Sequence, residues 1–510
     1  MLCKTYCATC VGLDAVTVTV EVDISVGIGL HLVGLPDSVV KESLLRVTTA
    51  LKSYGYRIPG RKIVVNMAPA DIRKQGSSYD LAIAIGLLSA SEQVYTPRRE
   101  QYIIMGELAL DGEIRPVAGA LPIAVYARDH GFKGCIFPKK SASEAIDIGE
   151  INIYSVSNLS EVIDILSDDI DVRHLLLSDK RKSVIVENRY NDFKDVKGQI
   201  LAKRGLEIAA AGGHNLILVG TPGSGKTFMA SCLPSILPPM SKDESIETSK
   251  IYSVAGKSIG NSGLLTERPF RTPHHSSSMI SLIGGGQNAI PGEISLAHNG
   301  VLYLDEIAEF SRMTLDMLRQ PLEDGKVDIS RLKYKVEYPS SFMLIASMNP
   351  CPCGYFGDGS GRCRCSPSMV LRYMSKLSGP LMDRIDMQIY VYPVPGGDLV
   401  RESVAESSSI IALRVAAARE IQRERFKSEG IFTNSQMSSR MIKKYCRIGE
   451  EEKAFLNNII DKLNISARAY SRILKLSRTI ADLEGINFIS LRNISEAIQY
   501  RNMDRANIYD

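Results

Sequence analysis

The sequence predicts a multidomain protein of mixed α/β and α+β class. Its parallel α/β core lies between an N-terminal α+β region and a helical C-terminal region. Three observations support this prediction. An apolar run at Asn215–Val219 leads into a glycine-rich loop and a helical pattern. Short strand-like and helical patterns alternate before residue 168, and strand patterns disappear after residue 401. A chain of 510 residues is long enough for about two to four domains.

The N-terminal domain is predicted to span residues 1–167. Val16–Val22 alternates in hydropathy with a period of two, which is typical of a half-buried strand. Lys62–Ala68 predicts another strand, and Leu81–Ala90 predicts an apolar helix. Residues 168–197 are charged and show little periodicity, so we expect a linker there.

The core, predicted over residues 198–395, contains a phosphate-binding loop motif. The pattern G-x-x-x-x-G-K-[ST] is matched by Gly220, Thr221, Pro222, Gly223, Ser224, Gly225, Lys226 and Thr227. Glycines let backbone N–H groups surround phosphate oxygens. Lys226 is placed to reach the β- and γ-phosphates, and Thr227 to ligate Mg²⁺. The motif therefore predicts ATP and Mg²⁺ as ligands.

Two later strands supply polar residues that complete such a site. Val301–Leu304 ends in Asp305 and Glu306. Asp305 is expected to hold Mg²⁺ through water, and Glu306 to polarise the water that attacks the γ-phosphate. The next buried-type strand ends at Asn349, which we expect to orient that water. The alternative for Asn349 is a simple cap on the strand end.

Arginines near the end of the core and in the C-terminal region are further candidates. Arg384 precedes an apolar strand; it either reaches the γ-phosphate of a neighbouring subunit or forms a surface ion pair. Arg468 and Arg472 share one face of a helix, and one of them is expected to fold a helical lid onto nucleotide. Spacing does not choose between them, and we prefer Arg468. The helices of residues 396–510 are predicted at Ile410–Phe426, Glu450–Leu463, Ala467–Leu483 and Leu491–Tyr500.

Two close cysteine pairs flank a glycine-rich stretch just after Asn349. They are Cys351 with Cys353, and Cys363 with Cys365. Four thiolates can hold Zn²⁺ tetrahedrally, although C-x-C is tighter than the usual spacing. The alternative is a set of free buried thiols.

Composition limits the possible partners and compartment. The net charge of +4 is too small to indicate nucleic acid by itself. No run approaches the roughly 18–20 apolar residues that a membrane span needs, so we expect no membrane partner. The first residues have no signal-peptide pattern, and ten cysteines without one suggest a reducing, cytoplasmic location.

The order of these motifs resembles that of AAA+ ATPases. Arg271–His275, Pro291–Gly300 and Met348–Gly354 resemble the magnesium-chelatase-like branch, in particular the bacterial ComM/YifB family. The resemblance implies an AAA+ core at 198–395 and a lid of the magnesium-chelatase C-terminal type at 396–510. It also implies a homohexameric ATPase of the helicase or translocase type that acts on branched or single-stranded DNA in recombination or natural transformation. Two segments, Ser277–Pro291 and Asp328–Val336, would then face the pore of the ring.

The N-terminal region resembles the Lon protease domain, of the ribosomal S5 domain 2-like fold. Gly106–Gly119 and Lys74–Ser78 carry this likeness. Ser78 falls at the nucleophile position, but Leu121 stands where the lysine base is expected. We therefore expect no Ser-Lys dyad and no peptidase activity, and a role in assembly or as a DNA-facing scaffold. Alternative functions are a chelatase-type motor subunit and a protein-remodelling unfoldase.

Overall fold

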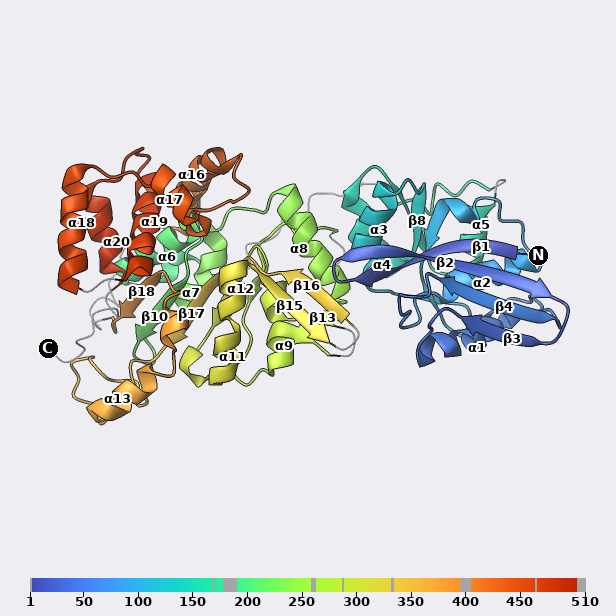
Figure 1. The fold of residues 1–510 in the computed structure, drawn as a ribbon, viewed down its shortest axis with the longest axis horizontal. Helices are drawn as coiled ribbons and strands as arrows, with labels where there is room; N and C mark the ends of the chain where they lie inside the picture. Colours follow the sequence, from blue (N-terminus) through green and yellow to red (C-terminus); the bar gives the residue numbers. More distant parts are fainter. Residues whose placement is uncertain are drawn as a thin grey trace.

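A computed structural model describes residues 2–167, 170–177, 190–257, 263–286, 289–331, 334–394, 405–463 and 466–501. These residues form an elongated molecule, with the N-terminal strands at one end and the C-terminal helices at the other (Figure 1). Residues 178–189, which make up much of the predicted linker, lie outside the described residues. Phe193, near the end of that linker, is fully buried in the core, so residues just before 198 already pack with the core.

The N-terminal region contains a seven-stranded mixed sheet in the order β3-β4-β2-β1-β5-β8-β9. Its long β1 and β2 pair antiparallel, whereas β5, β8 and β9 run parallel. The strands are β1 Leu2–Val11, β2 Asp14–Ser25, β3 Gly29–Val33, β4 Lys62–Ala68, β5 Tyr102–Ile104, β8 Gly134–Pro138 and β9 Asn152–Val156. A small hairpin joins β6 Glu107–Leu108 to β7 Ile114–Arg115.

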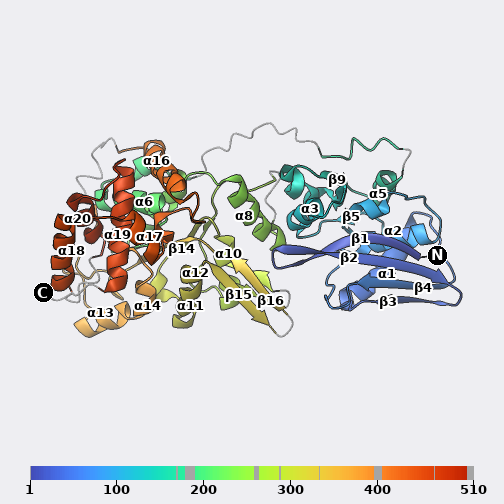
Figure 2. The same cartoon turned by 45° about the horizontal axis from the view of Figure 1, so that its top comes forward.

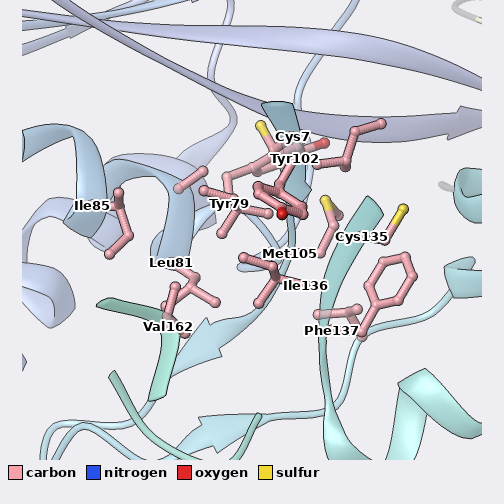
Figure 3. Packing of buried hydrophobic residues seen from close by; sticks show 14 of the residues in the cluster. Cys7, Tyr79, Leu81, Ile85, Tyr102, Met105, Cys135, Ile136, Phe137 and Val162 are labelled. Atoms are coloured by element: carbon pink, nitrogen blue, oxygen red, sulfur yellow. The ribbon is translucent and has the colours of Figure 1, made fainter. Parts of the chain in front are cut away.

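Helices cover this sheet and share a core with it (Figure 3). The predicted apolar helix is α2, Asp80–Ala90, and nearly every residue in it is buried. Its uniformly apolar sequence fits this position, because a helix that is apolar all round must be buried on all sides. The other helices are α1 Ser38–Ser53, α3 Ala120–Asp129, α4 Lys139–Ala142 and α5 Leu159–Leu166.

The central sheet has five parallel strands in the order β11-β14-β17-β10-β18. The strands are β11 Phe270–Arg271, β14 Val301–Leu304, β17 Met343–Met348, β10 Leu216–Gly220 and β18 Met387–Val391. The last four are almost wholly buried, as expected when both faces of a parallel sheet are covered. Because the strands are parallel, their carboxyl ends meet at one edge, which positions the candidate site.

Helices and hairpins surround this sheet. The helices are α6 Ile200–Gly212, α7 Lys226–Cys232, α8 Lys242–Val254, α9 Met279–Ile283, α10 Glu293–Leu296, α11 Arg312–Met317, α12 Arg319–Asp324, α13 Pro367–Met374 and α14 Gly379–Met382. One hairpin joins β12 Gly284–Gly285 to β13 Ile290–Pro291, and another joins β15 Lys326–Arg331 to β16 Tyr334–Pro339. The first falls in the predicted segment Ser277–Pro291, and the second includes the predicted segment Asp328–Val336. Residues 287–288 and 332–333 lie outside the described residues.

The C-terminal helices gather at one end of the molecule (Figure 2) and share a hydrophobic core with the central sheet. They are α16 Ser408–Phe426, α17 Ser439–Tyr445, α18 Glu450–Leu463, α19 Ala467–Leu483 and α20 Leu491–Gln499. The bounds of α18 and α19 agree with the prediction, while α17 was not predicted. Ser466 caps α19 by accepting a hydrogen bond from the Ala469 amide, which fixes where this helix begins.

Helix α8 connects the central and N-terminal regions, and both views place it beside α3. The Gly119 amide donates to the Ser253 carbonyl oxygen over 3.0 Å. The Ser253 hydroxyl donates to the buried carboxylate of Glu144 over 2.6 Å. Because these buried polar groups satisfy one another, the two regions are joined by more than chain connectivity.

Candidate nucleotide site

The phosphate-binding loop lies at the carboxyl end of β10, the strand between β17 and β18. Gly223 and Gly225 have φ values of +77° and +89°. Residues with a Cβ rarely adopt this left-handed conformation, so the turn depends on glycine at both positions. The loop therefore folds back over the end of the sheet before α7 begins at Lys226.

The Lys226 side chain lies within this loop. Its ammonium donates to the carbonyl oxygens of Gly220 and Thr221 over 2.7 and 2.9 Å. It also lies 3.4 Å from Asn349 Oδ1. Burial lowers the pKa of Lys226, while nearby Asp305 and Glu306 act in the opposite direction. The charged group is thus held inside the loop, where it can bind phosphate oxygens.

Asp305 follows β14 and lies beside the loop. Thr227 Oγ1 donates to Asp305 Oδ2 over 3.0 Å. Tyr303 donates to Oδ1 over 3.0 Å, and the Ser347 hydroxyl donates to the same oxygen. Burial acts to raise the pKa of Asp305, but these hydrogen bonds outweigh it and hold the pKa below its ordinary value.

These contacts fit a magnesium ion chemically. Hydroxyl and carboxylate oxygens are the ligands that Mg²⁺ uses in nucleotide sites, and Thr227 and Asp305 present one of each side by side. The ionised state of Asp305 is maintained by neutral donors, so no cationic side chain has to be displaced from it by a metal.

Glu306 has an unusual backbone conformation. Its φ is +49°, in the left-handed region that non-glycine residues seldom occupy. Its amide lies 3.1 Å from Asp305 Oδ1 and 3.3 Å from Ser347 Oγ, and these contacts hold the turn. The residue itself is exposed at the carboxyl edge. Such strain is often found where a functional side chain must be aimed away from the regular strand direction.

Asn349 follows β17, which lies between β14 and β10 in the sheet. Its side chain contacts Lys226, which places it between the loop and the Asp305–Glu306 turn. Ser347 was not identified in the sequence. It lies two residues before Asn349, and side chains two apart in a strand point to the same face. This spacing is the signal that indicates a second polar group at the same edge.

The four predicted cysteines come together in the loop between β17 and α13. The Sγ atoms of Cys351 and Cys353 are 3.3 Å apart, and Cys363 Sγ lies 3.8 and 3.6 Å from them. All four sulfurs, with that of Cys365, lie within 4.8 Å of one another. Backbone N–H groups of Tyr355 and Arg364 stabilise the Cys353 thiolate and lower the pKa of that thiol to about 6.

Arg384 lies at the opposite edge of the sheet from its own phosphate-binding loop. It precedes β18, whose Met387 pairs with Leu216 at the start of β10. The five residues of β10 separate the two edges by about 16 Å, because a strand rises about 3.3 Å per residue. The guanidinium donates to the Pro380 carbonyl oxygen and forms an ion pair with Glu323.

Arg468 and Arg472 lie near Arg384, and all three line one cavity of about 1030 Å³. Arg468 pairs with Asp383 over 3.0 Å, and Arg472 lies 3.5 Å from Asp386. Burial and then the positive charges of Arg468 and Arg472 lower the pKa of Arg384.

The expectation that one of these arginines folds a helical lid onto nucleotide stays a prediction; in this structure both lie in the cavity that holds Arg384. The start of α19 packs at the amino edge of the sheet, not over the phosphate-binding loop. The Arg472 side chain is 16% exposed and that of Arg468 is 68% exposed, so the two differ in freedom to move. The choice between them stays open.

The predicted Lon-like positions are occupied by structural residues. Leu121 is fully buried in α3, and its amide donates to the Ser253 hydroxyl over 3.3 Å. The carbonyl oxygen of Ser78 accepts from the Gly106 amide over 3.0 Å. Lys139 and Lys140, the other lysines near this sequence, are exposed at the start of α4. The Leu121 position thus serves the contact with α8.

Comparison with known proteins agrees with this arrangement. Residues 192–399 match the family model for magnesium chelatase, subunit ChlI. Residues 20–141 and 405–501 match further models, described as subunit ChlI of Mg-chelatase and its C-terminal part. The chain is 42% identical to YifB of Escherichia coli, with 94% of this chain and 93% of YifB covered.

Two other relatives are similar to the whole chain and to part of it, respectively. The chain is 42% identical to competence protein ComM of Haemophilus influenzae, covering 93% of this chain and 92% of ComM. It is 30% identical over 128 residues to Lon protease 2 of Bacillus subtilis, covering 25% and 23% of the two chains. With its Lon-like N-terminal similarity and its parallel phosphate-binding core, the chain belongs to the ComM/YifB family of magnesium-chelatase-like AAA+ proteins.

Proposed function

We propose that this protein is an ATP-hydrolysing motor that works as a homohexamer on branched or single-stranded DNA. The observation that supports it most is the division of the candidate site between two edges of one sheet. Lys226, Asp305 and Glu306 lie at the carboxyl edge, and Arg384 lies at the amino edge. One chain cannot close such a site, whereas a ring of identical chains brings the two edges of neighbours together.

In the proposed reaction, Lys226 and the loop amides bind the β- and γ-phosphates of ATP. Thr227 and Asp305 would hold Mg²⁺, which neutralises phosphate charge when bound. Glu306 accepts a proton from the attacking water, and Asn349 orients that water. Arg384 of the adjoining subunit stabilises the charge that develops on the γ-phosphate, together with Arg468 or Arg472.

The DNA part of the proposal rests on the relatives and on two segments of the core. ComM is named as a competence protein, which suggests a role in natural transformation or recombination for this chain. The β12–β13 and β15–β16 hairpins include the two segments expected to face a pore, where loops of this kind can grip a phosphate backbone. We propose a cytoplasmic location. None of the helices formed by the described residues combines the length and hydropathy that a membrane span needs.

A chelatase-type motor subunit is the second candidate, supported by the three family models. A protein-remodelling unfoldase is the third. One assay separates them: the rate of ATP hydrolysis with a four-way DNA junction, single-stranded DNA, casein or no addition. We expect strong stimulation by DNA and movement of the labelled junction. Stimulation by casein alone, with the junction left intact, would defeat the DNA proposal.

A further inference from the structure

We propose that Cys351, Cys353, Cys363 and Cys365 bind one zinc ion, and that this metal site holds the phosphate-binding loop in its nucleotide-binding conformation. The proposal about the loop rests on the proposed ATP site, whereas metal binding itself does not. Three sets of contacts carry the inference: the geometry of the sulfurs, the backbone of the cysteine loop, and its packing against Pro222.

The sulfur geometry fits a tetrahedral metal site. Four ligands about 2.3 Å from a central zinc lie about 3.8 Å from one another. The measured separations of 3.3, 3.8 and 3.6 Å among Cys351, Cys353 and Cys363 are close to this value. They are too long for a disulfide bond, which is about 2.05 Å. A four-iron cluster fits less well, because its thiolates bind different irons and lie farther apart.

The loop backbone is shaped to return the second cysteine pair to the first. Its glycines all have positive φ, a conformation that lets the short segment double back: Gly354 (+85°), Gly357 (+75°), Gly359 (+71°) and Gly361 (+68°). The Gly354 amide donates to the Cys351 carbonyl oxygen over 3.0 Å, which closes the first turn. Metal binding would cross-link this loop at both ends, and each thiol would release its proton as it binds.

The same loop packs directly on the phosphate-binding loop. A Cβ added to Gly354 would lie 2.7 Å from Cδ of Pro222, so the two backbones meet with no room for a side chain. A cavity of about 200 Å³ adjoins this contact, with Phe356 in one wall and Gly220 and Thr221 in another. Asn349, which contacts Lys226, lies only two residues before Cys351. The positions of Pro222, Gly220, Thr221 and Asn349 thus depend on where the cysteine loop lies.

Removal of the metal therefore has a definite consequence. Four thiolates without a cation repel one another, and four protonated thiols no longer bind a common central ion. In either case the cysteine loop loses its cross-link, and Pro222 loses the surface against which it packs. We expect nucleotide affinity to fall while the parallel sheet stays folded, because β10 and β17 are held by their own ladder.

The first experiment counts the metal. Elemental analysis of the purified full-length protein should give one zinc per chain. Replacement by Co²⁺ should produce the thiolate-to-cobalt absorption bands of a four-sulfur site. The variant Cys363→Ser with Cys365→Ser should lose the metal, and Cys10→Ser, in the N-terminal sheet, should keep it. The metal site is overturned if the wild-type protein contains no zinc. It is also overturned if the double variant has the same metal content as the wild type.

The second experiment tests the connection to nucleotide with a fluorescent ATP analogue. The double variant should bind the analogue about tenfold more weakly, which is the usual effect of losing groups that support a binding site without contacting the ligand. Cys10→Ser should bind the analogue as tightly as the wild type. Gly354→Ala provides a test that leaves all four cysteines in place: it should retain zinc and also bind nucleotide more weakly. Unchanged affinity in a zinc-free double variant, with wild-type circular dichroism, refutes the connection. If the wild type binds zinc but no nucleotide, the proposed ATP site fails while the metal site stands.

Discussion

Replacing Arg384 by alanine should abolish ATP hydrolysis without weakening ATP binding. The five-residue strand β10, about 16 Å long, separates the edge that holds Arg384 from the phosphate-binding loop of the same chain. Loss of Arg384 therefore leaves Lys226, Thr227 and Asp305 undisturbed. The affinity for a fluorescent ATP analogue should match that of the wild type.

The size of the effect follows from the role and the surroundings of the guanidinium. An arginine supplied to the transferring phosphate contributes about 10³–10⁵ in kcat. Arg468 and Arg472 line the same cavity and retain part of the positive charge after the substitution. We therefore expect a loss at the lower end of this range, about 10³-fold in kcat, which corresponds to an activation free energy higher by about 4 kcal/mol.

A mixing assay decides whether the arginine acts between chains. Lys226→Ala has an intact Arg384, and Arg384→Ala has an intact phosphate-binding loop. In rings formed from equal amounts of the two, about a quarter of the interfaces combine an intact loop with an intact arginine if assembly is random. Mixed samples should regain hydrolysis on this scale, although each variant alone is nearly inactive.

The control is Arg423→Ala, which removes an exposed arginine that pairs with Glu420 on α16. It should hydrolyse ATP at the wild-type rate. The reasoning is refuted if Arg384→Ala turns over normally, if its ATP affinity collapses, or if a strictly monomeric wild-type preparation is fully active. Failure of the mixture to exceed the sum of the two variants would argue against a site shared between chains.

Three further predictions test individual contacts. Glu306→Gln should bind ATP but lose at least about 10²-fold in kcat, because the amide cannot accept the proton; a normal rate would exclude Glu306 as the base. Ser347→Ala removes a hydrogen-bond donor to Asp305. It should therefore raise the pKa of Asp305 and weaken Mg²⁺-dependent ATP binding about tenfold. Since a lowered pKa keeps a carboxylate charged until the pH falls through it, this variant should lose binding at higher pH than the wild type in parallel Mg²⁺ titrations; identical pH profiles would contradict it. Glu323→Gln frees Arg384 from its ion pair and should lower the protein concentration needed for hydrolysis by about two- to fivefold, which corresponds to the free energy of a partly exposed ion pair. An unchanged concentration dependence would show that the pair does not compete with assembly.

Local patterns in the sequence were sufficient to predict the carboxyl edge of the sheet. The strand before the phosphate-binding loop, the strand ending at Asp305 and the strand ending at Asn349 all form as predicted, and they are neighbours in the sheet. Their polar residues follow directly from apolar runs, and parallel strands must end at one edge, so position along the chain determines position in space. The helices α18 and α19 were predicted with correct bounds for a similar reason, because each has a strong apolar face.

Features that depend on how distant elements pack could not be predicted in this way. No local pattern indicated that the start of α19, with Arg468, packs at the amino edge, because a helical pattern does not specify which surface the helix covers. Cysteine spacing suggested a metal site but not its contact with Pro222, which depends on two loops meeting. The left-handed conformation of Glu306 was also hidden, since glutamate gives no local signal for it.

In the proposed ring, the separation of the two edges would connect hydrolysis to assembly. A catalytic arginine beside its own phosphate-binding loop would let each chain consume ATP alone. Here the ion pair with Glu323 occupies Arg384 in the single chain, and the strand length keeps it from its own nucleotide. In the proposed ring, hydrolysis would require a neighbour to present its loop to the cavity that holds Arg384, Arg468 and Arg472. Because α19 supplies part of that cavity, any movement caused by loss of the γ-phosphate would pass into the helices of the adjoining chain. An interface that both completes the reaction and responds to it is the arrangement that a ring-shaped motor needs.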